Sequence, residues 1–139
     1  PTISVGSFGR GLSDWRLQKF SPNAWGFLNQ HSNALQGYYS DSLVILTPDG
    51  RDIRESWIGT QYNNEDAGKC EDDLSECDIV KTVFAIDTSK TINGFYPLTM
   101  IIDGRVRGKV YHSTIYRIEY QKDKGYVEPE DYPLKNMGY

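Results

Sequence analysis

Hydrophobic and polar residues alternate over most of this chain with a period of two, which is typical of β-strands. We expect a buried strand over Ser42 to Leu46, a second strand over Asp52 to Thr60, and a third over Ile79 to Ile86. The first two are separated by Thr47-Pro48-Asp49-Gly50, with Pro and Gly where β-turns favour them. The pattern therefore predicts an antiparallel sheet.

The segment from Phe95 to Tyr120 has two β-rich runs on either side of Asp103-Gly104. Asp-Gly between alternating apolar residues is the strongest short-range signal of a hairpin, because Gly adopts the positive φ that the turn needs. We therefore expect a closing hairpin with its turn at Asp103-Gly104. Four side chains after this turn should share one face: Arg105, Arg107, Lys109 and Tyr111.

One segment has the period of a helix instead. From Ala24 to Leu35, the stripe residues recur at i, i+3, i+4, i+7 and i+11. Ser21-Pro22 is typical of an N-cap followed by the first helical residue, and Gly37 is placed to end the helix. His31 lies on this stripe, so we interpret it as a packed core residue.

These elements predict a single α+β domain over residues 1–139, in which one helix packs on a predominantly antiparallel β-sheet. A β-sandwich with a helical insertion is the alternative architecture. Residues 2–20 predict a loose hairpin with alternating Ile3 and Val5. Residues 122–139, with Pro129 and Pro133 among charges and tyrosines, predict an extended C-terminal tail draped over the body.

Composition narrows the class of protein. With 38% hydrophobic and 24% charged residues the chain falls among globular proteins rather than disordered ones. A net charge of −4 opposes general attraction to nucleic-acid phosphates. The longest apolar run, Leu43 to Leu46, is far too short to cross a bilayer, so we expect no membrane insertion.

Two cysteines, Cys70 and Cys77, enclose the acidic sequence EDDLSE. A disulfide between them would close a small loop and favours an oxidising compartment, so we expect a secreted or extracytoplasmic protein. A zinc site or free thiols are the alternative, but tetrahedral zinc needs four ligands, and clustered His is missing. The acidic residues also lack the spacing of a calcium loop. We expect no metal and no cofactor.

Acid–base cleavage of RNA needs a base, an acid and a cation, and the chain contains candidates for all three: His112, Glu55 and Arg105. The order of an N-terminal hairpin, one helix and a sheet closed by a histidine-bearing strand resembles that of the secreted fungal ribonucleases of the guanyl-specific and ribotoxin kind. Within it, IIDGRVRGKVYHS, from Ile101 to Ser113, resembles their closing strand pair. The resemblance implies that His112 is the general acid.

The chain departs from that family at two places. Gly37 to Ser40 holds no histidine after the predicted helix, and Lys81 to Ile86 holds no glutamate. A ribonuclease-like hydrolase and an inactive relative that binds something else therefore both remain open. The structural alternative for His112 is a strand residue whose ring hydrogen-bonds a neighbour.

Binding without catalysis is the function that we favour. Ten tyrosines and three tryptophans exceed what one core requires, and tyrosine suits interfaces and sugar stacking. We predict a secreted binding module, effector-, inhibitor- or adhesion-like, that recognises a protein or glycan, with RNA as the alternative partner. The candidate binding residues are Arg105, Arg107, Lys109, Tyr111, Trp57, Tyr38 and Tyr39. The structural alternatives are basic side chains that guard a sheet edge and rings that pin loops to the body.

Overall fold

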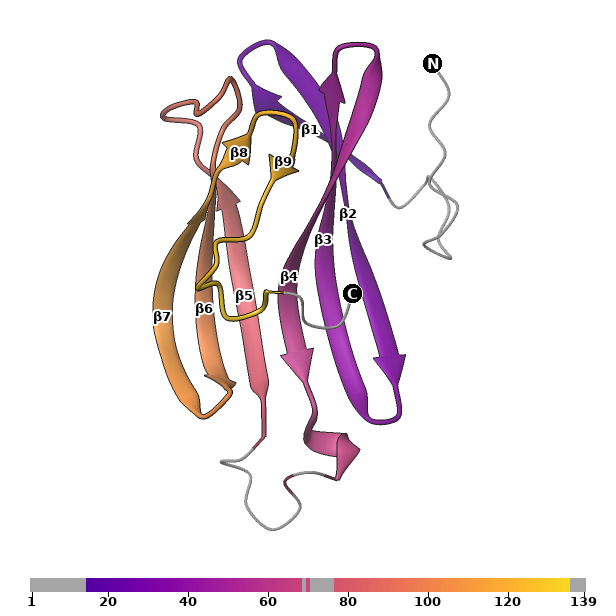
Figure 1. Ribbon diagram of the computed structural model, residues 1–139, viewed down its shortest axis with the longest axis vertical. Coiled ribbons are helices and arrows are strands. Elements are labelled where there is room, and N and C mark those ends of the chain that lie inside the picture. The colour runs from indigo at the N-terminus through magenta and orange to yellow at the C-terminus, as the bar shows by residue number, and fades with distance from the viewer. Residues whose placement is uncertain (1–14, 69, 71–76, 136–139) are drawn as a thin grey trace.

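The computed structural model describes residues 15–68, 70 and 77–135, and within them the chain forms one seven-stranded antiparallel sheet whose strands neighbour one another in sequence order (Figure 1). The strands are β1 (Arg16–Ser21), β2 (Ala24–Leu35), β3 (Tyr38–Asp49), β4 (Asp52–Asn63), β5 (Ile79–Ile86), β6 (Leu98–Val106) and β7 (Lys109–Ile118). A short 3-10 helix, η2 (Glu65–Ala67), follows β4, and a small separate hairpin, β8 (Tyr120–Gln121) and β9 (Gly125–Tyr126), follows β7. Most of the hairpin predicted over residues 2–20 lies outside the described residues; Arg16–Ser21 pairs with β2.

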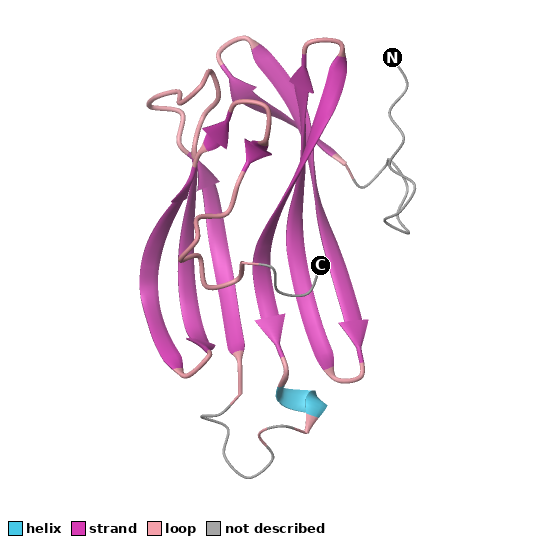
Figure 2. Cartoon of the chain, viewed as in Figure 1, coloured by secondary structure: helices cyan, strands magenta, loops and turns pink. Residues whose placement is uncertain are grey.

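The predicted helix is wrong: the described residues contain no α-helix, and Ala24–Leu35 is strand β2 (Figure 2). Both the α+β class and the sandwich with a helical insertion are therefore wrong as well. The apolar stripe matched a helical period, but the segment also holds Gly, Asn and Ser, which are weak helix formers. Pairing with β1 over Ala24–Leu28 and with β3 over Phe27–Leu35 decides the outcome, because these ladders satisfy backbone groups that a helix would otherwise have paired internally.

The two signals assigned to the ends of that helix belong to hairpin turns. Ser21 does accept a backbone hydrogen bond, but from Asn23 (3.2 Å), in the turn that joins β1 to β2. Gly37, with Gln36 before it, has positive φ and forms the two-residue turn between β2 and β3. Such turns need positive φ at both central residues, so Gly37 ends a strand by the same conformational freedom that would end a helix.

The hairpin predicted around residues 47–50 and the strand predicted over Ile79–Ile86 are confirmed. β3 and β4 pair from Tyr39↔Asn63 to Asp49↔Asp52, so the turn lies at Gly50 and Arg51, two residues later than expected. Gly50 has φ +64, the conformation for which the turn needs glycine.

The closing hairpin also exists, but its turn is not Asp103-Gly104. The turn is Arg107-Gly108, between β6 and β7, and both residues have positive φ. Asp103-Gly104 lies inside β6 at a β-bulge, where Gly104 has φ +133 and the register with β7 shifts. Gly104 therefore adopts a positive φ, as the predicted turn required, but it does so at a bulge within a strand and not in a turn.

The sheet consists of two halves, β1–β4 and β5–β7, that meet along a short seam. β4 and β5 pair at only three positions, from Gln61↔Lys81 to Asn63↔Ile79. Figure 1 shows the halves in contact at this end of the strands and spread apart at the other, with β8 and β9 across the opening. Among the described residues, most of β4 therefore has no partner in the large sheet on its β5 side.

The chain from β9 onward supplies hydrogen-bond partners along this side of β4. The Gly59 amide donates to the buried carboxylate of Glu128 (2.9 Å), and the Gly59 carbonyl accepts from the Tyr132 hydroxyl (2.6 Å). The amide of Tyr126 donates to the Ser56 hydroxyl (3.0 Å). We call residues 125–134 the strap. Its side chains replace part of a missing strand pairing along β4, which satisfies buried backbone groups.

The strap is part of the hydrophobic core and not an extended tail lying on the surface. Tyr126, Tyr132 and Leu134 are buried in one cluster with residues of both halves, including Ile58 and Met100. Burial raises the pKa of the Tyr126 and Tyr132 phenols far above the usual value, so both stay uncharged. Residues 122–135 contain little regular structure beyond β9, and those of the strap fill part of the core. The last four residues of the tail predicted over 122–139 lie outside the described residues.

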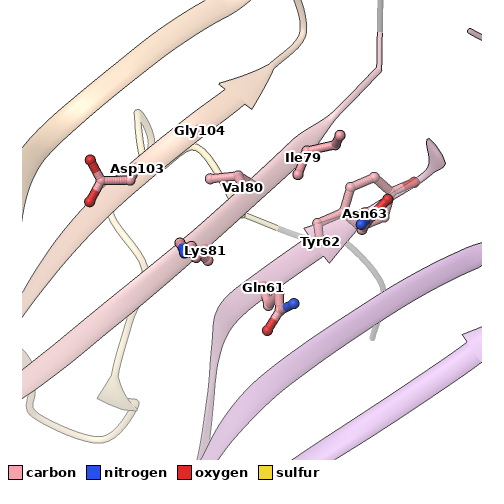
Figure 3. Close-up of a pocket in the computed structure, with 8 residues that line it drawn as sticks. All are labelled: Gln61, Tyr62, Asn63, Ile79, Val80, Lys81, Asp103 and Gly104. Atoms are coloured by element: carbon pink, nitrogen blue, oxygen red, sulfur yellow. The ribbon is translucent and has the colours of Figure 1, made fainter. Parts of the chain in front are cut away.

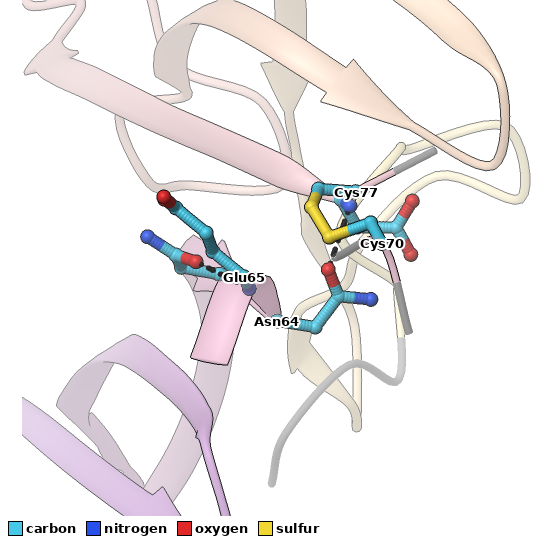
Figure 4. The surroundings of a disulfide bond; sticks show 6 residues. Asn64, Glu65, Cys70 and Cys77 are labelled. Atoms are coloured by element: carbon cyan, nitrogen blue, oxygen red, sulfur yellow. Dashed lines mark hydrogen bonds between the residues drawn. A yellow bond between two sulfur atoms is a disulfide. The ribbon is translucent and has the colours of Figure 1, made fainter. Parts of the chain in front are cut away.

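Cys70 and Cys77 form a disulfide, as predicted, just beyond the seam (Figure 4). Both cysteines are buried. Beside them, the amide of Asp78 donates to the Asn64 side chain (2.8 Å) and the amide of Asn64 donates to the Asp78 carbonyl (3.0 Å). The link thus fixes the point where the chain passes from β4 to β5.

Replacing both Cys70 and Cys77 with serine is expected to lower the free energy of unfolding by about 2.5 kcal/mol, because the crosslink closes a short loop in the unfolded chain. Equilibrium unfolding in urea, followed by tryptophan fluorescence, measures the change. Reduction of the wild-type protein with dithiothreitol should give the same shift, and equal stabilities in all three samples would contradict it.

Candidate functional site

The surface of β5–β7 that faces away from the core carries an ordered array of side chains. Because directly paired residues share a face, the registers define its rows across the three strands. One row is Val83–Ile101–Ile115, the next is Lys81–Asp103 with the bulge residues of β7 beside them, and the third is Ile79–Arg105–Val110. We call these three rows the outer face.

The first row is apolar and exposed. Val83 and Ile115 each expose 68% of their surface, with Ile101 between them. Single exposed apolar residues are ordinary, but a contiguous row across three strands is a feature of interaction sites. β-branched side chains on a paired strand also lose little freedom when they are covered.

The neighbouring rows are mainly charged. Lys81 and Arg105 flank Asp103, whose carboxylate accepts a hydrogen bond from the Ser113 amide (2.8 Å) and so supports the bulge. Beyond the apolar row, Arg117 lies 3.8 Å from the Asp87 carboxylate. Hydrogen bonds from Ser89, together with Arg117, lower the pKa of the Asp87 carboxyl, which stays ionised. Lys81 and Arg117 therefore border the apolar row with Asp103 and Asp87 beside them, and Arg105 lies one row further along.

A pocket of about 260 Å³ opens on this surface at the seam between the halves (Figure 3). Its lining comes from three neighbouring strands: Gln61, Tyr62 and Asn63 from β4, Ile79, Val80 and Lys81 from β5, and Asp103 and Gly104 from β6. The side chains of Gln61, Lys81 and Asp103 lie along one cross-strand row. The bulge brings Gly104 so close to β5 that a Cβ atom there would lie 2.1 Å from the Ile79 carbonyl oxygen. A polar rim thus borders a largely apolar wall.

Two of the predicted binding residues lie in one row of this surface. Tyr39 pairs with Asn63, which pairs with Ile79, which pairs with Arg105. Tyr39 is 44% exposed. The structure therefore brings an aromatic and a cationic candidate to the same end of the sheet, three strand spacings apart, or about 14 Å.

The predicted common face of the four hairpin residues is wrong. Because the turn is Arg107-Gly108, Arg105 lies on β6, Arg107 lies in the turn, and Lys109 and Tyr111 lie on β7. Tyr111 belongs to the core, with the Lys109 ammonium 5.3 Å from its ring centroid. The Arg107 amide donates to the Asp78 carboxylate (2.8 Å). A single basic surface is not formed by these residues.

Trp57 and Tyr38 lie elsewhere on the sheet. The Trp57 indole donates to the Glu55 carboxylate on the same strand, and its ring meets His31 edge-on at 5.3 Å. His31, predicted as a helix core residue, is half-buried on β2. Tyr38 packs on Tyr62 with ring centroids 6.5 Å apart.

The catalytic set suggested by the ribonuclease resemblance is not assembled. His112 lies beside Asp103 on the neighbouring strand. Asp103 pairs with Lys81 and Lys81 pairs with Gln61, so His112 is at the level of Gln61 on β4. Glu55 lies six residues earlier on β4, about 20 Å along the strand. β7 is also three strands away from β4. A general acid and base must both reach the substrate, so this pair cannot act on one phosphodiester. The Arg105–Val110 pair does place Arg105 near His112.

Sequence reasoning named Arg105 and, as a catalytic candidate, the bulge residue His112, but it missed the other residues of the outer face. The signal was present in DIVKTVFAI, where apolar residues occupy both alternating sets of positions. Such a strand is normally buried on both faces. Here Val80 is buried, while Ile79 and Val83 are exposed.

Comparison with known proteins finds no family model, no curated protein and no solved structure that matches this chain. No helix in the described part of the chain has the length and apolar character needed to span a membrane. A function is therefore inferred from the surface of the protein itself.

Proposed function

We propose that this protein is a secreted binding module that recognises a protein partner through the outer face of β5–β7. The observation that carries the proposal is the exposed apolar row Val83–Ile101–Ile115 between cationic neighbours. Contiguous apolar surface with a polar border is the usual composition of a protein interface. The disulfide is consistent with an extracellular location.

The charges favour a particular kind of partner. Lys81 and Arg117 border the row and Arg105 lies one row beyond Lys81, against Asp103 beside Lys81 and Asp87 beside Arg117, although the chain carries a net charge of −4. A partner surface with an apolar stripe and acidic groups would match this arrangement. Complementary charge sets orientation and association rate, while the apolar row supplies most of the affinity. This supports an effector-, inhibitor- or adhesion-like role.

The proposal is tested with a double variant, Val83→Glu and Ile115→Glu, which places charge on the apolar row. A partner captured from the native environment and then purified should bind this variant at least about tenfold more weakly than the wild type, because central interface residues carry most of the binding energy. Isothermal titration calorimetry measures the dissociation constants.

Leu17→Glu is the matched control. Leu17 is 61% exposed on β1, at the opposite edge of the sheet, so an apolar residue is replaced by glutamate once, instead of twice, far from the outer face. The control should keep wild-type affinity. Equal affinity in the double variant, or equal loss in the control, would refute the proposal, as would a captured partner that proves to be RNA.

A further inference from the structure

We infer that the seam pocket between β4, β5 and β6 binds a tyrosine side chain of the partner protein. This inference rests on the proposed function, since the pocket and the outer face share Ile79, Lys81 and Asp103 and form one surface. A partner that covers the apolar row could therefore also reach the pocket. The inference specifies what the partner presents there.

The size of the pocket fits one aromatic side chain. Its volume is about 260 Å³. An apolar cavity of about 150 Å³ in another protein takes up a benzene molecule. The seam pocket therefore has room for a six-membered ring with a substituent, and it is small for a larger ligand.

The wall of the pocket suits the face of a ring. Ile79, which is 37% exposed, supplies aliphatic surface on which the face of a ring can pack. An aromatic side chain buries a large flat area on such a surface, which favours an aromatic over a smaller aliphatic occupant. The backbone at Gly104 approaches β5 closely and gives the pocket a firm floor.

The rim selects a ring with a hydroxyl group. Lys81 and Asp103 are directly paired across β5 and β6, so an ammonium donor and a carboxylate acceptor border the opening together. The amide of Ser113 occupies one of about four acceptor sites of the Asp103 carboxylate. A phenol both donates and accepts, so it suits both groups, whereas a phenylalanine ring offers them neither a donor nor an acceptor.

A titration with small probes tests this inference without the partner. N-acetyltyrosinamide is added to ¹⁵N-labelled protein, and amide shifts are followed by NMR. We expect saturable shifts at Tyr62, Ile79, Val80 and Gly104. N-acetylphenylalaninamide should bind at the same place at least about fivefold more weakly, which corresponds to one net hydrogen bond.

Two variants separate the wall from the rim. Ile79→Trp fills the pocket and should abolish the shifts caused by both probes. Asp103→Asn keeps an oxygen for the Ser113 amide but removes the charge, so the preference for tyrosine should fall below about twofold. Leu17→Glu serves as the folded control with wild-type binding.

Probe shifts away from the seam, equal binding of the two probes, or an unchanged preference in Asp103→Asn would overturn the inference. These outcomes are distinct from failure of the proposed function. If the double variant on the apolar row loses the partner while tyrosine shows no preference, the pocket inference fails and the proposed function stands. If tyrosine binds as expected while the double variant keeps full affinity for the partner, the proposed function fails.

Discussion

Replacing Tyr132 with alanine is expected to lower the free energy of unfolding by about 4 to 6 kcal/mol, a large part of the 5–15 kcal/mol of a typical domain. Tyr132 is only 1% exposed and packs edge-on against Tyr116 with ring centroids 5.6 Å apart. Removing the ring leaves a cavity in the core, and it also leaves the Gly59 carbonyl without its donor. Urea unfolding followed by tryptophan fluorescence measures the change.

Tyr132→Phe is the matched control for this experiment. It keeps the ring and removes only the hydroxyl that donates to Gly59, so it should cost about 1 to 2 kcal/mol. A loss below about 1 kcal/mol in Tyr132→Ala would show that the strap does not hold the two halves of the sheet together.

Replacing Gly104 with valine is expected to prevent folding or to destabilise the protein by more than about 4 kcal/mol. Gly104 has φ +133, which β-branched residues do not adopt, and an added Cβ would lie 2.7 Å from the Val80 Cα as well as against the Ile79 carbonyl. Both obstacles are backbone atoms, so the contact can be relieved only by parting β5 and β6. Soluble yield and thermal unfolding by circular dichroism measure the effect.

Gly108→Ala separates backbone strain from collision. Gly108 also has positive φ, at +78, and lies in the turn of the same hairpin, but nothing lies within 4 Å of an added Cβ. It should cost only about 1 kcal/mol, from strain alone. If Gly104→Val lost no more stability than Gly108→Ala, the close approach of β6 to β5 at the bulge would be contradicted.

The outer face and the strap together explain how a chain of this size can present an apolar row. The strap, Phe20 and the inward side chains of both halves form one buried cluster, so the apolar residues of the outer face are not needed for the core. These exposed residues are therefore available for binding. The two halves meet at the seam, where the pocket also lies, so the disulfide beside the seam supports the pocket through the chain that enters β5.

Signals in the sequence were sufficient to predict an element where a few neighbouring residues decide its conformation. The hairpin of β3 and β4 follows from its turn residues and alternation, β5 from its alternation, and the disulfide from the spacing of Cys70 and Cys77. The same signals misled where one residue type serves several conformations. Gly37 and Gly104 both supply positive φ, but only their partners across the sheet decide between helix end, turn and bulge.

The sequence alone is sufficient to predict a strand-rich domain with a Cys70–Cys77 link, because alternation, turn chemistry and cysteine spacing act over a few residues. Three features needed the folded structure: that Ala24–Leu35 is a strand, that residues 125–134 fill the core, and which face of β5–β7 stays exposed. Alternation shows that a strand has two faces but not which one is covered. That choice depends on packing between segments distant in sequence, here the strap against both halves of the sheet.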